Sequence, residues 1–216
     1  MSLYQNLITM VLAASGATKI ALSQGPVTGA FTINGSLATG GVATLDVPRR
    51  VLITSAGNDS GITFTVTGTG ANGLALSEVL TGGNATGVYT NHDFATVTGI
   101  SSSAATASTV EAGTNGVGSS IPVIVDTIVN PANYGVAVTV TGTVTYTVEM
   151  SYDDFAPLFD LNANTPTWFP ASGFNSQTSN QNGNIVGPCT MIRLTVNSGT
   201  GTVSMKLIKP LIAGAF

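Results

Sequence analysis

Charged side chains are scarce in this sequence. Asp, Glu, Lys and Arg make up 7% of its 216 residues, whereas ordinary soluble domains carry about 25%. The net charge is also small, at −4, and so few charges provide little of the repulsion that keeps soluble proteins apart. We therefore expect other proteins, or other copies of this chain, to cover much of its surface.

Basic clusters and cysteines are also lacking. The ten acidic and six basic residues are spread thinly along the chain, so no basic run is present to neutralise a phosphate backbone or anionic lipids. We expect no direct binding of nucleic acid and no association with a membrane. The single cysteine, Cys189, excludes an intramolecular disulfide and is typical of a protein folded in a reducing cytoplasm.

Residue types that carry catalysis are equally few. His92 is the only histidine, and no Gly-x-Ser-x-Gly motif accompanies it. Asp153, Asp154 and Asp160 form the one acidic cluster, but their spacing matches no calcium loop, and adjacent strand residues point to opposite faces. We predict that the protein is not an enzyme and has no metal site and no cofactor. A surface hydrolase is the alternative that this shortage disfavours.

Threonine, glycine, serine, alanine and valine are abundant instead, a composition that favours β-strands. From Thr18 onward, short alternating runs separated by Gly and Asn recur about every eight to twelve residues, the spacing of a sandwich or barrel. In residues 62–67, Ile, Phe and Val alternate with Thr, which predicts a strand with one buried face. The sequence predicts an all-β fold of two β-sandwich units, of jelly-roll or immunoglobulin-like type, with an extended N-terminal arm.

The composition also suggests where the units begin and end. Residues 112–120 are rich in Gly and Ser with almost nothing to bury, which predicts a linker. The first β-sandwich unit is then expected over residues 18–111 and the second over residues 121–216. An irregular, aromatic-rich insertion is expected over residues 155–187 of the second unit, and insertions of this kind are often functional.

Two segments have the pattern of a β-hairpin. Strands over residues 50–55 and 62–67 flank a turn rich in Gly, Asn and Asp. Strands over residues 191–196 and 203–207 flank the segment Asn-Ser-Gly-Thr-Gly in the same way. The sequence therefore predicts one such hairpin in each unit.

The arm, residues 1–17, is apolar and has no basic residue before Lys19. A secretory signal needs a basic start, and about ten apolar residues are too few to span a bilayer. We expect a neighbouring subunit or the surface of a larger particle to hold this arm, with strand addition to a partner's sheet edge as the favoured mode. Its predicted partner-binding residues are Leu3, Tyr4, Leu7, Ile8 and Val11.

The aromatic insertion supplies two further predicted partner-binding residues, Trp168 and Phe169. Aromatic rings beside Asn and Gln can form a platform that stacks on a sugar. The alternative is that these rings cover the open end of a sandwich or lie in a subunit interface. Both interpretations remain open from the sequence.

Several segments resemble virion structural proteins of tailed bacteriophages. In the first half these are RRVLIT (residues 49–54), GITFTVTG (61–68), EVLTGG (78–83) and FATVTGI (94–100). In the second half they are YTVEMSYDD (146–154), WFP (168–170), GNI (183–185) and the stretch from Pro188 into MIRLT (191–195).

The resemblance implies a non-enzymatic component of the virion, made in the host cytoplasm. We expect a capsid decoration or cement protein that forms a homo-oligomer, with a trimer favoured, and that contacts other virion proteins such as the major capsid protein. The alternative is a tail, adaptor or fibre-associated protein that binds a receptor glycan.

Overall fold

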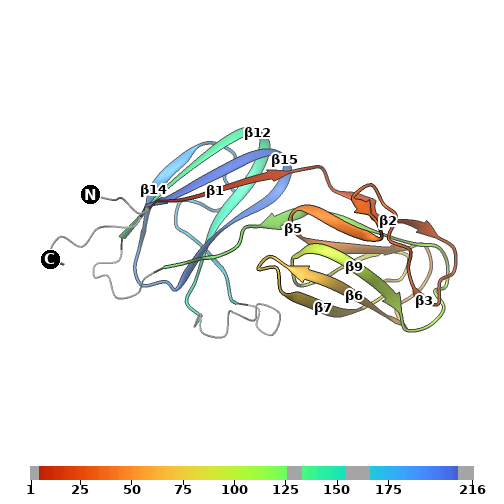
Figure 1. The fold of residues 1–216 in the computed structure, drawn as a ribbon. Helices are drawn as coiled ribbons and strands as arrows, with labels where there is room; N and C mark the ends of the chain where they lie inside the picture. The colour runs from red at the N-terminus through yellow and green to blue at the C-terminus, as the bar shows by residue number, and fades with distance from the viewer. Residues whose placement is uncertain (1–4, 126–132, 154–165, 209–216) are drawn as a thin grey trace. The chain divides into compact units, whose positions relative to one another are not determined.

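The computed structural model describes residues 5–125, 133–153 and 166–208. They divide into two compact units. Unit 1 contains residues 5–13, 119–125, 133–153 and 166–208, and unit 2 contains residues 14–118. The regular structure of the described residues is entirely β-strand (Figure 1), which confirms the predicted all-β class. No described segment forms a helix with the length and apolarity needed to cross a bilayer.

Unit 2 is an antiparallel assembly of short strands. They are β2 (Gly16–Gln24), β3 (Gly29–Ala30), β4 (Ala38–Thr39), β5 (Val42–Ser55), β6 (Thr63–Gly70), β7 (Ala75–Thr81), β8 (Gly87–Tyr89), β9 (Phe94–Ser102) and β10 (Val110–Ser119). The pairing order is β2–β10–β5–β9–β6–β7, with β3 on β9 and with β4 and β8 on β5.

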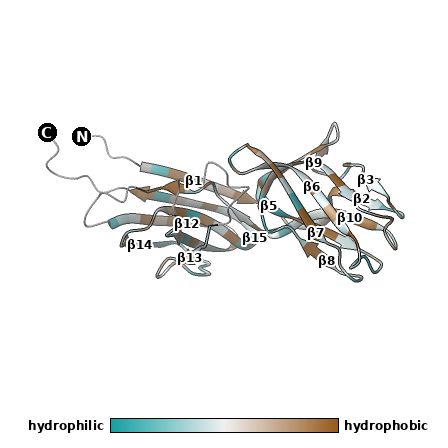
Figure 2. Ribbon diagram, turned by 90° about the horizontal axis from the view of Figure 1, so that it is seen from below, coloured by the Kyte–Doolittle hydropathy of each residue, from teal (hydrophilic) through white to brown (hydrophobic). Residues whose placement is uncertain are grey.

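The core of unit 2 follows from alternation along these strands. On β6, Phe64 and Val66 are fully buried while the alternating threonines, residues 63, 65 and 67, are half-buried, as the pattern of residues 62–67 predicts. Figure 2 shows apolar and polar residues interspersed along the strands. One apolar cluster results, as in a β-sandwich, and it includes Ile20, Ala43, Val51, Ile53, Phe64, Val66, Phe94, Val97, Ile100 and Val110.

Unit 1 is built around two long strands. Its elements are β1 (Gln5–Leu12), β11 (Val123–Ile124), β12 (Asn133–Ser151), β13 (Phe169–Pro170), β14 (Gln181–Val186) and β15 (Met191–Ile208). Strand β15 pairs with β12 along one edge and with β1 and β11 along the other. Strands β13 and β14 pair with the far edge of β12, so part of the predicted irregular insertion is ordered against this sheet.

Neither predicted hairpin forms. Strand β6 pairs with β7 and β9 rather than with β5, and residues 191–208 form the single strand β15, with a register shift opposite Thr145 and Tyr146. Glycine near the shift serves close packing, since a Cβ on Gly199 would lie 2.4 Å from the carbonyl oxygen of Thr143. Gly201 lies directly opposite Gly142 on β12.

The predicted arm is a strand of its own subunit. Over Gln5–Leu12, β1 pairs antiparallel with Gly201–Ile208 of β15 without a register shift, and Figure 1 shows the two strands side by side. Met10 and Leu12 are buried in unit 1. The expectation of an extended arm was therefore wrong, because β15 offers the apolar segment an edge within the same chain.

The predicted linker is also a strand. Residues 112–120 fall almost entirely in β10, which pairs with β5 through Ala112, Gly113 and Thr114. A Cβ on Gly113 would lie 1.9 Å from the carbonyl oxygen of Gly16. The small side chains of this segment permit the close approach of β2. The sequence pattern alone did not distinguish a glycine-rich strand from a flexible loop.

Edge strand β7 carries a carboxylate that anchors a loop. Glu78 is 8% exposed, and its oxygens accept hydrogen bonds from the backbone N–H groups of Asn91 (2.7 Å) and His92 (3.0 Å). The Nδ1 atom of His92 lies 2.9 Å from the same carboxylate. Glu78 therefore holds the segment between β8 and β9 against β7.

Replacing Glu78 by Ala should lower the free energy of unfolding by about 2 to 3 kcal/mol, because two amide donors lose a charged acceptor. Denaturant unfolding measures the change. The matched control is Ser77→Ala on the exposed side of the same strand, expected to stay within about 0.5 kcal/mol. Equal effects of the two substitutions would contradict the anchoring role.

In unit 1, Tyr146 is fully buried and donates a hydrogen bond from Oη to the carbonyl oxygen of Ser179, at 3.0 Å. Burial raises the pKa of its phenol from 10.0 to about 12. The unfolded chain loses this proton at lower pH than the folded chain does. The contribution of the neutral Tyr146 phenol to the free energy of unfolding should therefore be fully present below pH 10.0 and should be lost as the pH rises toward about 12.

Tyr146→Phe should remove this part of the alkaline loss of stability, with Tyr152→Phe, at an exposed tyrosine, as the control. Denaturant unfolding across the alkaline range gives the two pH profiles. Parallel profiles for Tyr146→Phe and the parent protein would show that ionisation of Tyr146 is not coupled to folding.

Candidate binding face

The described residues of the predicted arm are divided between two faces of the unit 1 sheet. Leu7 and Val11 are 61% and 56% exposed, whereas Ile8 is half-buried and lies on the same side as Met10. Leu3 and Tyr4 lie outside the described residues. Only Leu7 and Val11 are thus placed together on an accessible surface.

These two residues belong to a broad exposed surface, which we call the outer face. Directly opposed residues in antiparallel strands point to the same side of the sheet, so the register fixes its members. They are Leu7, Thr9 and Val11 of β1; Thr202, Ser204, Lys206 and Ile208 of β15; Ala137, Thr139 and Thr141 of β12; and Asn182, Asn184 and Val186 of β14. Lys206 is the only charged residue in this set.

The outer face combines small polar side chains with isolated apolar ones. Leu7, Val11, Val186 and Ile208 are among the exposed large hydrophobic residues of the chain. The opposite side of the same strands carries Met10, Val138, Val203 and Met205, which are buried. Unit 1 therefore has one core face and one face that is open and nearly uncharged.

Trp168 and Phe169 do not form one platform. Phe169 pairs with Met150 across β13 and β12, and its ring lies 5.8 Å from that of Tyr152 at an interplanar angle of 59°. Trp168 instead stacks on Arg193, whose Cζ lies 4.1 Å from the ring centroid. Trp168 lies just before β13, and the two rings contact different partners.

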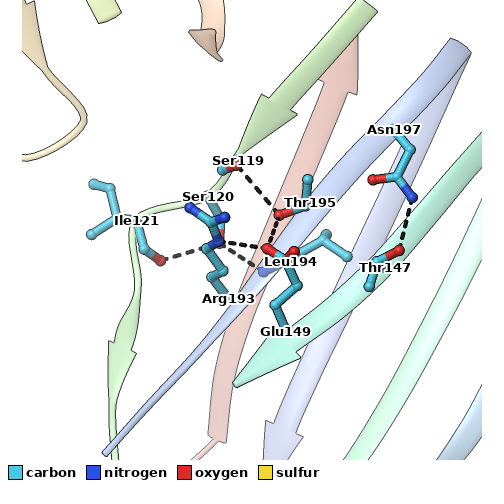
Figure 3. Close-up of polar contacts among 9 residues, drawn as sticks. All are labelled: Ser119, Ser120, Ile121, Thr147, Glu149, Arg193, Leu194, Thr195 and Asn197. Atoms are coloured by element: carbon cyan, nitrogen blue, oxygen red, sulfur yellow. Dashed lines mark hydrogen bonds and ion pairs between the residues drawn. The ribbon is translucent and has the colours of Figure 1, made fainter. Parts of the chain in front are cut away.

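Arg193 is part of a polar network that sequence reasoning missed (Figure 3). Its Nε donates to Oε2 of Glu149 at 2.7 Å, and the hydroxyl of Thr195 donates to the same oxygen at 2.7 Å. Ser119 lies 3.3 Å from the Thr195 hydroxyl. Glu149 and Arg193 are directly opposed on β12 and β15, a relation that only the strand register reveals.

Neighbouring side chains extend the polar network. Thr147 Oγ1 accepts hydrogen bonds from Asn197 Nδ2 (2.7 Å) and from the backbone N–H of Ser176 (3.0 Å). The backbone N–H of Leu194 donates to Ser120 Oγ at 3.0 Å. These contacts connect β12 and β15 with the segments on either side, and they give the network a stabilising role.

The other polar candidates have local partners. Asp153 accepts a hydrogen bond from the backbone N–H of Thr167, at 2.5 Å, while Asp154 and Asp160 lie outside the described residues. Within the described ranges, no group of three His, Cys, Asp or Glu side chains is placed to hold a metal ion. Cys189 is buried, and desolvation raises the pKa of its thiol, which disfavours the reactive thiolate.

Comparisons with known proteins do not assign a family. No family model matches the chain, and no curated protein matches it. Among solved structures, the chain is similar to the major capsid protein P2 from bacteriophage PM2, with 8% identity, a TM-score of 0.17, and coverage of 98% of this chain and 100% of that one. Similarity at this level transfers neither fold nor function.

Because Trp168 is the only tryptophan, its fluorescence reports on the contact with Arg193. Arg193→Ala should shift the emission to longer wavelength and increase quenching by acrylamide, since the ring loses its guanidinium cover and gains water. Lys206→Ala, which removes an exposed cation from the same strand, should leave the spectrum unchanged. Identical spectra for all three proteins would exclude the stacked arrangement in solution.

Proposed function

We propose that this chain is a non-enzymatic structural protein of a virion, and more specifically a capsid decoration protein that self-associates and contacts the major capsid protein. The outer face of unit 1 carries the proposal. It spans β1, β15, β12 and β14, most of its residues are exposed, and Lys206 is its only charged residue. A sheet surface of this kind is suited to burial against another protein.

Two features of the sequence support the virion assignment. Charged residues are 7% of the chain, which suits a protein whose surface is covered by partners. Segments in both halves resemble virion proteins of tailed bacteriophages. A decoration protein that binds only the assembled shell stabilises it by mass action, and many modest contacts add up over the particle.

The copy number of the chain in purified virions tests the proposal. We expect quantitative mass spectrometry to find the chain in numbers comparable to the major capsid protein, because decoration proteins follow the capsid lattice. A few copies per particle would instead indicate a tail component. Absence of the chain from purified virions would overturn the virion assignment.

The second candidate is a tail or fibre component that binds a receptor glycan. The ring pair formed by Tyr152 and Phe169 favours it, because both side chains are about half exposed and exposed aromatic rings can stack on sugars. Glycan-array binding that is lost in Phe169→Ala and kept in Val186→Ala would support this role. Equal binding by both variants would exclude the ring pair as the sugar site.

A further inference from the structure

Strand β1 is an edge strand without the usual protection against pairing. Its eight residues, Gln5–Leu12, pair with β15 on one side, and no described strand pairs with its other side. It contains no charged residue and no proline, and its register with β15 runs without a bulge. Exposed edges of this length normally carry a charge, a proline or a bulge, because unpaired N–H and C=O groups recruit another strand.

Two other edges of the same chain are less suited to such pairing. In unit 2, edge strand β7 has the inward-pointing carboxylate of Glu78 at its centre. In unit 1, β14 has no charge, proline or bulge either, but it is shorter, at six residues, and half of these are Asn or Gly, which are poor strand formers. Of these three described edges, β1 is therefore the longest and the best suited to pairing with a further strand.

We propose that β1 is a self-pairing edge, to which β1 of a second copy adds antiparallel about a two-fold axis through Thr9. An uncharged edge brings no like charges together when it meets a copy of itself. Main-chain hydrogen bonds then supply the affinity, as in other cases of strand addition. This interface would extend the proposed structural role by specifying how copies of the chain associate.

The side-chain pattern of β1 fits this axis. In an antiparallel pair of identical strands, the outer faces of both copies lie on the same side of the joined sheet only if the two-fold axis passes between two copies of the same residue. With the axis at Thr9, residues 6–12 of one copy pair with residues 6–12 of the other. Leu7 of one copy then lies opposite Val11 of the other on the outer face, and Ile8 lies opposite Met10 on the other side. Cross-strand apolar pairs of this kind stabilise a sheet.

The proposed contact has a defined symmetry and strength. A two-fold, isologous contact closes at two copies, so it predicts a dimer rather than the trimer expected from the sequence. One pair of eight-residue strands buries a small area, so the dissociation constant should be on the order of micromolar. The joined sheets would present two outer faces as one continuous surface.

Thr9 gives a direct test, because its exposed side chain would lie on the two-fold axis. Thr9→Lys places two ammonium groups opposite each other and should weaken the dimer by about tenfold or more, the effect of about 1.4 kcal/mol. The control is Thr139→Lys, in the same cross-strand row through Ser204 but about 10 Å from the edge. Sedimentation equilibrium measures both, with circular dichroism as a check on folding.

A dimer weakened by Thr9→Lys and unaffected by Thr139→Lys is the expected result. A monomer at all concentrations, a trimer, or equal weakening by both substitutions would overturn the proposal, the last because it would indicate stacking through the outer face. Mild oxidation provides a second measurement. Thr9→Cys should form covalent dimers and Thr139→Cys should not, since the native Cys189 is buried.

These outcomes are separate from the proposed function. A chain present in many copies on virions, whose association is insensitive to Thr9→Lys, would retain its structural role and lose the self-pairing edge. A dimer that dissociates with Thr9→Lys but is absent from virions would keep the edge and lose the virion role.

Discussion

The antiparallel ladder between β12 and β15 is the constraint on which unit 1 depends. It pairs Gly135 with Ile208 at one end and Ser151 with Met191 at the other. Its register decides which residues share a side, and so it creates both the buried core and the open outer face. It also brings Glu149 opposite Arg193, and the resulting ion pair positions the guanidinium against Trp168. Strands β1, β11, β13 and β14 then attach to the two free edges of this pair.

The sequence predicted strand content well and strand partners poorly. Alternation in residues 62–67 identifies β6 and its buried face, because period-two patterning is local. Pairing is not local: β6 takes β7 and β9 as partners. The glycines of residues 197–201 resemble a turn in sequence, but they permit close contact between β15 and β12 within continuous strands. Gly113 likewise contributed to the prediction of a linker, whereas it lies within strand β10 and permits close packing there.

The candidate surface was predicted in part for the same reason. Leu7 and Val11 were identifiable as apolar residues in an uncharged segment, but the sheet that they join could be known only from the pairing with β15. Trp168 and Phe169 stand out by residue type, yet Trp168 contacts Arg193 and Phe169 contacts Tyr152. Glu149 and Arg193 gave no local signal, because a single charged residue within a strand usually faces solvent.

The position of β1 in the chain has a consequence for biosynthesis. Thr9 and its hydrogen-bonded partner Ser204 are separated by 195 residues, so β1 leaves the ribosome long before β15 exists. Unit 2 lies between them in the sequence and can fold while β1 still lacks its partner, since domains generally fold as units during synthesis. Throughout that interval an uncharged, aggregation-prone strand is exposed on the nascent chain, and its final docking must await the last residues of β15.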